Sequence, residues 1–480
     1  MRSEREKRKR MQRAADQKNI NLNLTEAIVI LAVIIAVMFV GIIALGLDPH
    51  LPLLVDIGVI FFAGRIKGIP WGEMFNSMMQ FLGQNMSAVV VILLIGVLIG
   101  SFMTCGAVPV VIYYGLKFMS ARWFFLFAVL LSFVMALITG SSFTSVSTLG
   151  VAFMGVGLSL GIPPALIAGA IVSGALAGDK HSPLSAVANL GASLCGVSVF
   201  ETEKSLRYTT LPTVLLSAVV FTVIGARYSS GNADTSQVET ILNGLTENYN
   251  LSLLAILPLL LMLALVILKV PAFPTLIISS LAGTVCSVLL QRVPLVDCLK
   301  YMQTGYEAHT GVELLDTLLS RGGLFSMASV VIIIMMGLSL AGGMSRLSVM
   351  AIVMEKIGAG LKGRFSVMTG TFLITFLLVL ISSDTYMAMV LTVESMKKCF
   401  KRVGVHPVVL SRCLVDGGCA LVGIVPWCPA GMFYSETLGV PIREFAPFYI
   451  LGFGTVLFTL ISAATGIGVK YIKTDEEGAQ

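Results

Sequence analysis

Apolar segments recur along almost the whole chain and are separated by short polar turns. A helix needs about 20 apolar residues to cross the hydrocarbon core of a bilayer, and eight segments approach that length without a polar interruption, although the second is short. They are residues 25–47, 51–64, 86–104, 208–226, 251–268, 271–290, 325–343 and 445–469. This pattern predicts a chain that crosses a membrane many times.

Four further apolar segments are interrupted by polar residues near their middle. These segments are residues 122–160, 163–195, 365–402 and 406–437. The interruptions fall at residues 139–145, 178–183, 382–385 and 416–429. Because non-helical backbone within a membrane is tolerated only beside protein or a water-filled cavity, we expect broken helices whose polar breaks enclose a site.

Composition and charge narrow the class of protein. The chain is 56% hydrophobic and only 12% charged, about half the charged share of a soluble protein, which excludes a soluble enzyme, a disordered chain and a nucleic-acid binder. Residues 1–18 hold eight Lys or Arg against three acidic residues, and we interpret them as a cytoplasmic anchor. Residues 25–47 are too long for the core of a signal peptide and lack a cleavage site, so they are kept as a span.

The Lys and Arg residues predict that both termini are cytoplasmic, since cytoplasmic loops carry an excess of these residues. With the N-terminus inside, the hydrophilic loop 229–250, which has no Lys or Arg, falls outside. Segments 122–160 and 365–402 then return to the side on which they began. Each is either two full crossings or a re-entrant hairpin with its tip at mid-depth, and we favour the hairpin because both tips are rich in Ser and Thr.

The two halves of the chain resemble each other at a shift of about 240 residues. The tip at 141–144 lies over the tip at 382–385, and a shift of 243 places Pro183 over Pro426. With the topology above, the halves have opposite orientation, as in secondary transporters built from inverted repeats. The sequence therefore predicts an all-α polytopic membrane protein with inverted structural repeats, re-entrant hairpins and broken transmembrane helices.

This organisation divides the chain into five parts. We expect a basic cytoplasmic segment, a first membrane repeat, an extracytoplasmic loop, a second inverted repeat and a cytoplasmic tail, at residues 1–24, 25–228, 229–250, 251–470 and 471–480.

The chemistry is expected at the polar interruptions. An ionisable side chain at mid-bilayer costs about 2.5–3.5 kcal/mol and therefore marks a functional candidate, and Asp179, Asp384 and Asp416 lie in or beside the breaks. Carbonyls freed by a broken helix, hydroxyls and one carboxylate form a hard oxygen cage suited to Na⁺, which we expect at Asp179 and Asp384. The candidate ion- or substrate-binding residues are Asp179, Lys180, Ser141, Ser142, Thr144, Ser182, Ser382, Ser383, Asp384, Thr385 and Asp416.

Structural roles are open for the same residues. Asp179 could serve only its loop as an ion pair or a cap, and Lys180 could simply neutralise a carboxylate. The Ser and Thr residues of both tips could be helix caps, and Asp416 could cap a half-helix or pair with Arg412. His181 could be a packed histidine or a proton relay.

Three stretches carry a resemblance to a known family. They are residues 178–185 (GDKHSPLS), residues 410–418 (LSRCLVDGG) with Pro426-Trp427, and residues 382–386 (SSDTY). At these stretches the chain resembles the NhaC family of sodium/proton antiporters, over roughly residues 25–470. The resemblance implies inverted repeats, opposed hairpins and a mobile transport domain on a dimeric scaffold. Relatives in the same family resemble exchangers of organic acids or amino acids.

We therefore expect a secondary active antiporter, not an enzyme, that exchanges Na⁺ for H⁺ by an elevator-type alternating-access mechanism. Ionised Asp179 would bind Na⁺, and because burial favours a neutral carboxylic acid, a proton could displace the ion. The alternative is Na⁺- or H⁺-coupled antiport of organic acids or amino acids, with Lys180 holding the substrate carboxylate. A zinc protease is excluded because the chain has no H-E-x-x-H motif, whereas a channel would share the polar tips.

The expected partners are the transported Na⁺ and H⁺, the lipid bilayer and a second copy of the chain in a homodimer. We expect no nucleic acid and no cofactor, since Na⁺ is cargo. The expected location is the bacterial cytoplasmic (inner) membrane.

Overall fold

The computed structural model describes residues 22–84, 86–118, 121–229, 235–268 and 270–472. Across these residues the chain is almost entirely helical, and the isolated bridge between Val405 and Tyr471 is the one β-type pairing that they contain. Eight described helices are long and apolar enough to cross a membrane, or up to 11 if each bent pair is one span. The prediction of an all-α, multi-pass membrane protein is confirmed.

The first half contains the predicted spans and both predicted interruptions. It begins with α2 (Leu24–Phe39), η2 (Val40–Ala44), α3 (His50–Ile66), α4 (Trp71–Gln84), α5 (Met86–Thr104) and α6 (Ala107–Phe118). It continues with α7 (Ala121–Thr139), α8 (Ser142–Ser145), η3 (Val146–Gly150), α9 (Val151–Ser159), α10 (Pro164–Lys180), α11 (Ala186–Cys195) and α12 (Val199–Ser229). The helices α8, η3 and α9 form one helical run, Ser142–Ser159.

The second half opens with a helix where the sequence indicated only a hydrophilic loop. This helix, α13 (Thr235–Asn248), buries Ile241 and Leu245 on one face, so it packs on the molecule as an amphipathic element. The helices that follow are η4 (Leu253–Ile256), α14 (Leu257–Ile267), α15 (Ala272–Leu290), α16 (Leu295–Thr304), α17 (Glu313–Leu319), η5 (Leu324–Met327) and α18 (Ala328–Arg346).

The last part of the chain holds the second polar tip and the second broken helix. Its elements are α19 (Val349–Gly360), α20 (Arg364–Ser382), α21 (Thr385–Arg402), α22 (Pro407–Cys419), η6 (Val422–Ile424), α23 (Pro429–Leu438), α24 (Ile442–Phe445), η7 (Ala446–Phe448) and α25 (Ile450–Thr465). The helices α20 and α21 meet at the second polar tip, and α22 and α23 are separated by the second break.

The same order of elements occurs in both halves, and from the first tip onward the two copies are 243 residues apart. Matching positions include the ends of α7 and α20, the starts of α10 and α22, and the whole of α11 and α23. This register corrects our alignment of the tips. Ser141 is the N-cap of α8 and Asp384 is the N-cap of α21, so Asp384 corresponds to Ser141 and not to Phe143. The paired serines in both tips had favoured a shift two residues smaller.

The two halves also pack in a reciprocal way. Helix α3 of the first half packs against α18 of the second, and α15 of the second half packs against α5 of the first. Within each half the helix before the tip packs on the broken helix, α7 on α10 and α20 on α22. Exchanging the halves therefore reproduces the main contacts, which is the relation expected of two structural repeats.

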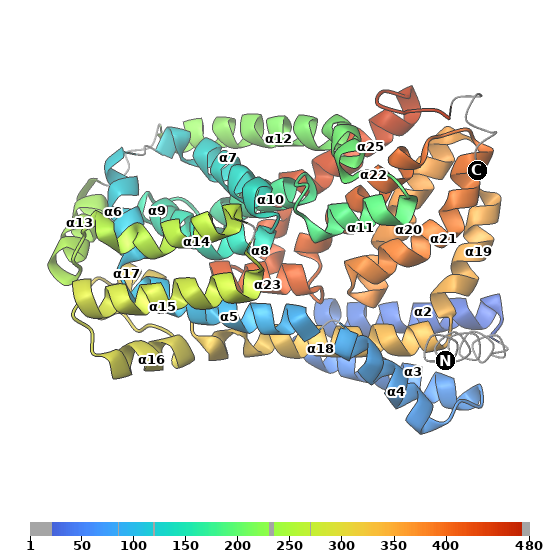
Figure 1. Ribbon diagram of the computed structural model, residues 1–480, viewed down its shortest axis with the longest axis horizontal. Coiled ribbons are helices and arrows are strands. Elements are labelled where there is room, and N and C mark those ends of the chain that lie inside the picture. The colour runs from blue at the N-terminus through green and yellow to red at the C-terminus, as the bar shows by residue number, and fades with distance from the viewer. Residues whose placement is uncertain (1–21, 85, 119–120, 230–234, 269, 473–480) are drawn as a thin grey trace.

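The long axis of the molecule has two distinct ends (Figure 1). Helices α13 and α6 lie at one end, and α19 lies at the other. The last described residues are at the α19 end, because Ile472 N–H donates to the carbonyl of Gly404 just beyond α21. The broken helices and their tips lie between these two ends.

Candidate functional site

The first tip and the first break meet at one carboxylate. The chain turns at Gly140, whose φ is +67°, and Ser142 then begins α8. Asp179 lies in the last turn of α10 and directs its carboxylate to this helix start. A Cβ on Gly140 would lie 2.7 Å from the carbonyl carbon of Leu184, so the close approach of tip and break requires glycine.

Three hydrogen-bond donors converge on Asp179. Its Oδ2 accepts from the backbone N–H of Ser142 at 3.0 Å and from the Ser142 hydroxyl at 2.6 Å. Its Oδ1 accepts from the Ser185 hydroxyl at 2.8 Å. The positive end of the helical run that starts at Ser142 adds a favourable dipole. These groups stabilise a charged carboxylate that forms no ion pair with a described residue, and they bring together hard oxygens of the kind that Na⁺ prefers.

A residue of the second half reaches this cluster. The hydroxyl of Tyr434, on α23, donates to the Ser142 hydroxyl at 2.8 Å, and both groups are buried. A chain of hydrogen bonds therefore runs from Tyr434 through Ser142 to Asp179. It connects the second broken helix to the carboxylate of the first.

The acidic residue of the second break, Asp416, has a buried lysine as its counter-ion. Lys180 Nζ lies 3.0 Å from Asp416 Oδ1 and donates at 2.9 Å to the hydroxyl of Thr455, and both charged side chains are fully buried. Arg412 does not pair with Asp416, since it donates to two backbone carbonyls and to the Ser462 hydroxyl. Lys180 therefore neutralises Asp416 and joins α10 to α22, which was one of the two roles left open for it.

The second tip packs against the second break. Asp384 caps α21 by accepting from the Met387 N–H at 2.5 Å, and Ser383 has φ +57°, in the left-handed region. Thr385 donates to the carbonyl of Gly418 at 3.3 Å. Across the break, the Trp427 ring N–H donates to the carbonyl of Leu380 at 2.6 Å.

Several predicted site residues have their side chains engaged elsewhere. The Ser182 hydroxyl donates to the carbonyl of Leu137 on α7 at 2.7 Å, and that of Ser382 donates to the carbonyl of Leu378. Ser141 accepts from the N–H of Thr144 as a helix cap. The structure thus brings Ser142 to Asp179, while Ser141, Ser182 and Ser382 organise the backbone of the tip and the break.

Two further groups lie close to the breaks. His181 Nδ1 lies 3.2 Å from Glu203 Oε2 of α12, and both side chains are only 10% exposed. Tyr386 follows the tip residue Thr385 at the start of α21 and is 42% exposed.

Sequence reasoning missed three residues of the polar network. Ser185 closes the motif around Asp179 and lies six residues from it, so the motif itself was a signal. Tyr434 is 292 residues from Ser142, and Thr455 is 275 residues from Lys180. Their contacts result from packing of the second half on the first, which no local pattern in the sequence reveals.

The comparison with known families concerns the region that contains both breaks. A model of the Na⁺/H⁺ antiporter family matches residues 174–467. The chain belongs to this family. This membership identifies it as a transporter and not an enzyme, and it agrees with the resemblance to NhaC proteins.

Similar curated proteins align with nearly the whole length of this chain. The Na⁺/H⁺ antiporter NhaC of Alkalihalophilus pseudofirmus is 31% identical over 442 residues, which cover 92% of this chain and 94% of that protein. The malate-2H⁺/Na⁺-lactate antiporter of Bacillus subtilis is 30% identical and covers 96% and 99%. The arginine/ornithine antiporter ArcD of Halobacterium salinarum is 31% identical and covers 95% and 94%.

Proposed function

We propose that this protein exchanges Na⁺ for H⁺ across the bacterial cytoplasmic membrane and that Asp179 binds the two ions in turn. Family membership and the NhaC relative support cation antiport. The observation that carries the assignment to Asp179 is its set of partners. Among the described residues this carboxylate has no ion-pair partner, and it is hydrogen-bonded to a tip, to a break and, through Ser142, to the second half of the chain.

The coupling follows from the cost of burying charge. Without Na⁺, the hydroxyls of Ser142 and Ser185 donate to the carboxylate. On Na⁺ binding these hydroxyls rotate and offer lone pairs to the ion, and on proton binding the carboxyl group becomes neutral. An empty, charged site is costly to move through a low-dielectric barrier. The site therefore crosses with Na⁺ in one direction and with H⁺ in the other.

The moving unit in this proposal contains both tips and both broken helices. The Lys180–Asp416 ion pair ties α10 to α22 inside it and adds no net charge. A scaffold that includes α2, α3, α14 and α15 stays fixed, since these helices hold none of the polar breaks. The reciprocal packing of the halves supports inverted repeats and an elevator-type movement. In the same proposal two scaffolds form a homodimer and both termini are cytoplasmic.

Replacement of Asp179 tests the proposal. Asp179→Asn keeps the size of the side chain but cannot ionise, so Na⁺-driven proton movement should fall to the background of empty vesicles. Asp179→Glu should keep weak exchange with a shifted pH dependence. Asp384→Asn is the comparison variant: Asn is as good an N-cap as Asp, so the fold should be preserved, and we expect exchange to be damaged but less than in Asp179→Asn.

The measurement is the dissipation of a pH gradient when Na⁺ is added to proteoliposomes, with monodispersity of each purified variant checked alongside. Exchange by Asp179→Asn at the wild-type rate would show that Asp179 is structural. The ion site would then have to lie around Asp384 and Asp416.

A second candidate function, antiport of an organic anion, is favoured by a different cavity. This cavity, of about 530 Å³, lies between the segment before α18 and the end of α23, and Arg321 lines it together with Glu307 and Glu436. Within the part of the chain that the structure describes, the Arg321 guanidinium makes one long hydrogen bond, 3.4 Å, to the Thr437 carbonyl. Lys180 is fully buried in its ion pair, so Arg321 is the better partner for a substrate carboxylate. Exchange that needs malate or an amino acid, and is lost in Arg321→Gln, would favour this alternative.

A further inference from the structure

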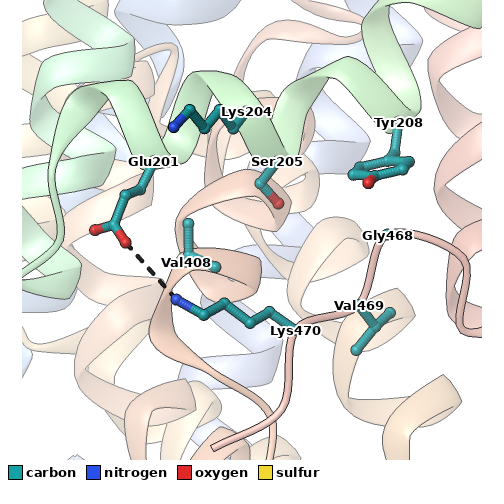
Figure 2. A pocket seen from close by; sticks show the side chains of 8 residues that line it. All are labelled: Glu201, Lys204, Ser205, Tyr208, Val408, Gly468, Val469 and Lys470. Atoms are coloured by element: carbon teal, nitrogen blue, oxygen red, sulfur yellow. Dashed lines mark ion pairs between the residues drawn. The ribbon is translucent and has the colours of Figure 1, made fainter.

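A second cavity, of about 600 Å³, opens beside the start of α12 and shares no residue with the Asp179 cluster (Figure 2). Lys204, Ser205 and Tyr208 of α12 form one wall, and the segment that follows α25 forms the other. Lys470 is the charged residue of that second wall.

The cavity carries an excess of positive charge. Lys204 and Lys470 line it, and Glu201 is the acidic residue of the lining, 3.7 Å from Lys470. Arg412 adds a third cation beneath the wall, because its guanidinium donates to the carbonyls of Ser205 and Gly468. Arg412 is 1% exposed, and none of the carboxylates in the described residues lies within ion-pair distance of it. A buried guanidinium without a counter-ion favours binding of an anion nearby.

The cavity also has a hydroxyl with no partner. Ser205 is 6% exposed, and its Oγ makes no hydrogen bond with any described group. Buried hydroxyls in proteins are nearly always hydrogen-bonded, so the Ser205 hydroxyl on this wall has a hydrogen bond available for a ligand. Figure 2 shows Ser205 between Lys204 and Tyr208 on the same wall.

The position of the cavity favours a lipid as the source of the anion. From Tyr208 onward, α12 exposes an apolar stripe at helical spacing, formed by Leu211, Leu215, Val219 and Val223. Such a stripe faces lipid tails. The cavity lies where the stripe ends, and basic pockets between helices beside such a boundary bind lipid phosphates.

We propose that this cavity binds a phosphate group, supplied by the headgroup of an anionic phospholipid. Lys204, Lys470 and the Ser205 hydroxyl contact the phosphate oxygens, and Arg412 contributes its charge from below. The site is independent of the Asp179 cluster and of the substrate that is transported. Its test therefore does not depend on whether the proposed exchange is correct.

Thermal unfolding of the purified protein in neutral detergent tests the site, since a ligand of the native state raises the midpoint. Phosphatidylglycerol is titrated against phosphatidylcholine, and inorganic phosphate is titrated separately. Lys204→Gln and Ser205→Ala should each raise the half-saturating concentration of phosphatidylglycerol about two- to fivefold. Glu201→Gln removes the opposing charge and should lower it by a similar factor. Lys398→Gln, which removes an exposed lysine outside the cavity, should leave it unchanged.

The opposite effects of Glu201→Gln and Lys204→Gln exclude misfolding as the cause, because a misfolded variant does not gain affinity. Saturation by phosphatidylglycerol alone identifies a lipid headgroup, and equal saturation by inorganic phosphate identifies a free anion in the same phosphate site. The proposal is overturned if neither ligand raises the midpoint, or if Lys398→Gln changes binding as much as Lys204→Gln.

Discussion

At the scale of single residues, the two aspartates beside the breaks show how surroundings decide the role of a carboxylate. Asp416 holds a buried lysine 3.0 Å away, which already occupies the place of a cation. Asp179 instead receives neutral donors from Ser142 and Ser185. Neutral donors can turn away from a carboxylate. Lys180 cannot leave Asp416 without leaving a buried charge that has no partner. In the proposed exchange, these surroundings favour Asp179 over Asp416 as the carboxylate that takes an ion.

The hydroxyl of Tyr434 should tune this site from the second half of the chain. Tyr434→Phe removes the donor that holds the Ser142 hydroxyl. A hydrogen bond of this kind contributes about 0.5–1.5 kcal/mol, so the Na⁺ concentration for half-maximal exchange should rise about two- to tenfold. The measurement is the Na⁺ dependence of exchange in proteoliposomes.

Tyr449→Phe is the matched control for that variant. The Tyr449 hydroxyl is also buried, but it has no hydrogen-bond partner among the described residues, so its removal should leave the Na⁺ dependence unchanged. An identical shift in both variants would mean that the effect comes from packing and not from the link to Ser142.

At the scale of elements, the sequence predicted the breaks and tips well because Gly, Pro, Ser and Thr interrupt otherwise apolar runs there. The breaks after Thr139, Lys180 and Ser382 are where the pattern placed them. The short or amphipathic helices α4, α6 and α13 were missed, since their apolar residues are too few for a span. The contact between Ser142 and Asp179 could not be predicted, because it depends on how the tip folds back onto α10. The assignment of ion-binding roles remains a prediction.

The fit between the first tip and its break makes Gly140 a sensitive position. Gly140→Ala forces a side chain into a positive-φ conformation, which costs about 1–2 kcal/mol, and brings Cβ within 3 Å of Leu184. We expect a large loss of thermal stability in detergent and loss of exchange, because the start of α8 can no longer reach Asp179.

Gly161→Ala separates the effect of backbone strain from the effect of the contact with Leu184. Gly161 has nearly the same φ, +71°, but nothing lies within 4 Å of its added Cβ, so this variant suffers only the backbone strain. Its midpoint of thermal unfolding should be a few degrees lower than that of the wild type, and it should retain exchange. If both variants behave alike, the contact between tip and break does not matter for transport.

At the scale of the whole molecule, charge is distributed unequally between the two ends of the long axis. The end that holds α19 and the last described residues carries Arg364, Lys401, Arg402 and Lys470. Arg364 donates to the Ala463 carbonyl and the Tyr471 hydroxyl, and Lys470 pairs with Glu201. The end that holds α13 and α6 carries Glu239 and Glu247 on α13, which has no Lys or Arg, and Lys117 on α6. Cytoplasmic surfaces of membrane proteins are rich in Lys and Arg, so we expect the α19 end in the cytoplasm and α13 outside.

Labelling of single cysteines tests this orientation. Cys286 is the one native cysteine of the eight that is not buried, so Cys286→Ser removes the native thiol that could react with the label. In that background Glu247→Cys, on the exposed face of α13, should react in whole cells with a membrane-impermeant maleimide. Lys398→Cys, exposed near the end of α21, should react only after the cells are opened. The reverse pattern would place α13 in the cytoplasm and invert the direction in which Asp179 must deliver Na⁺.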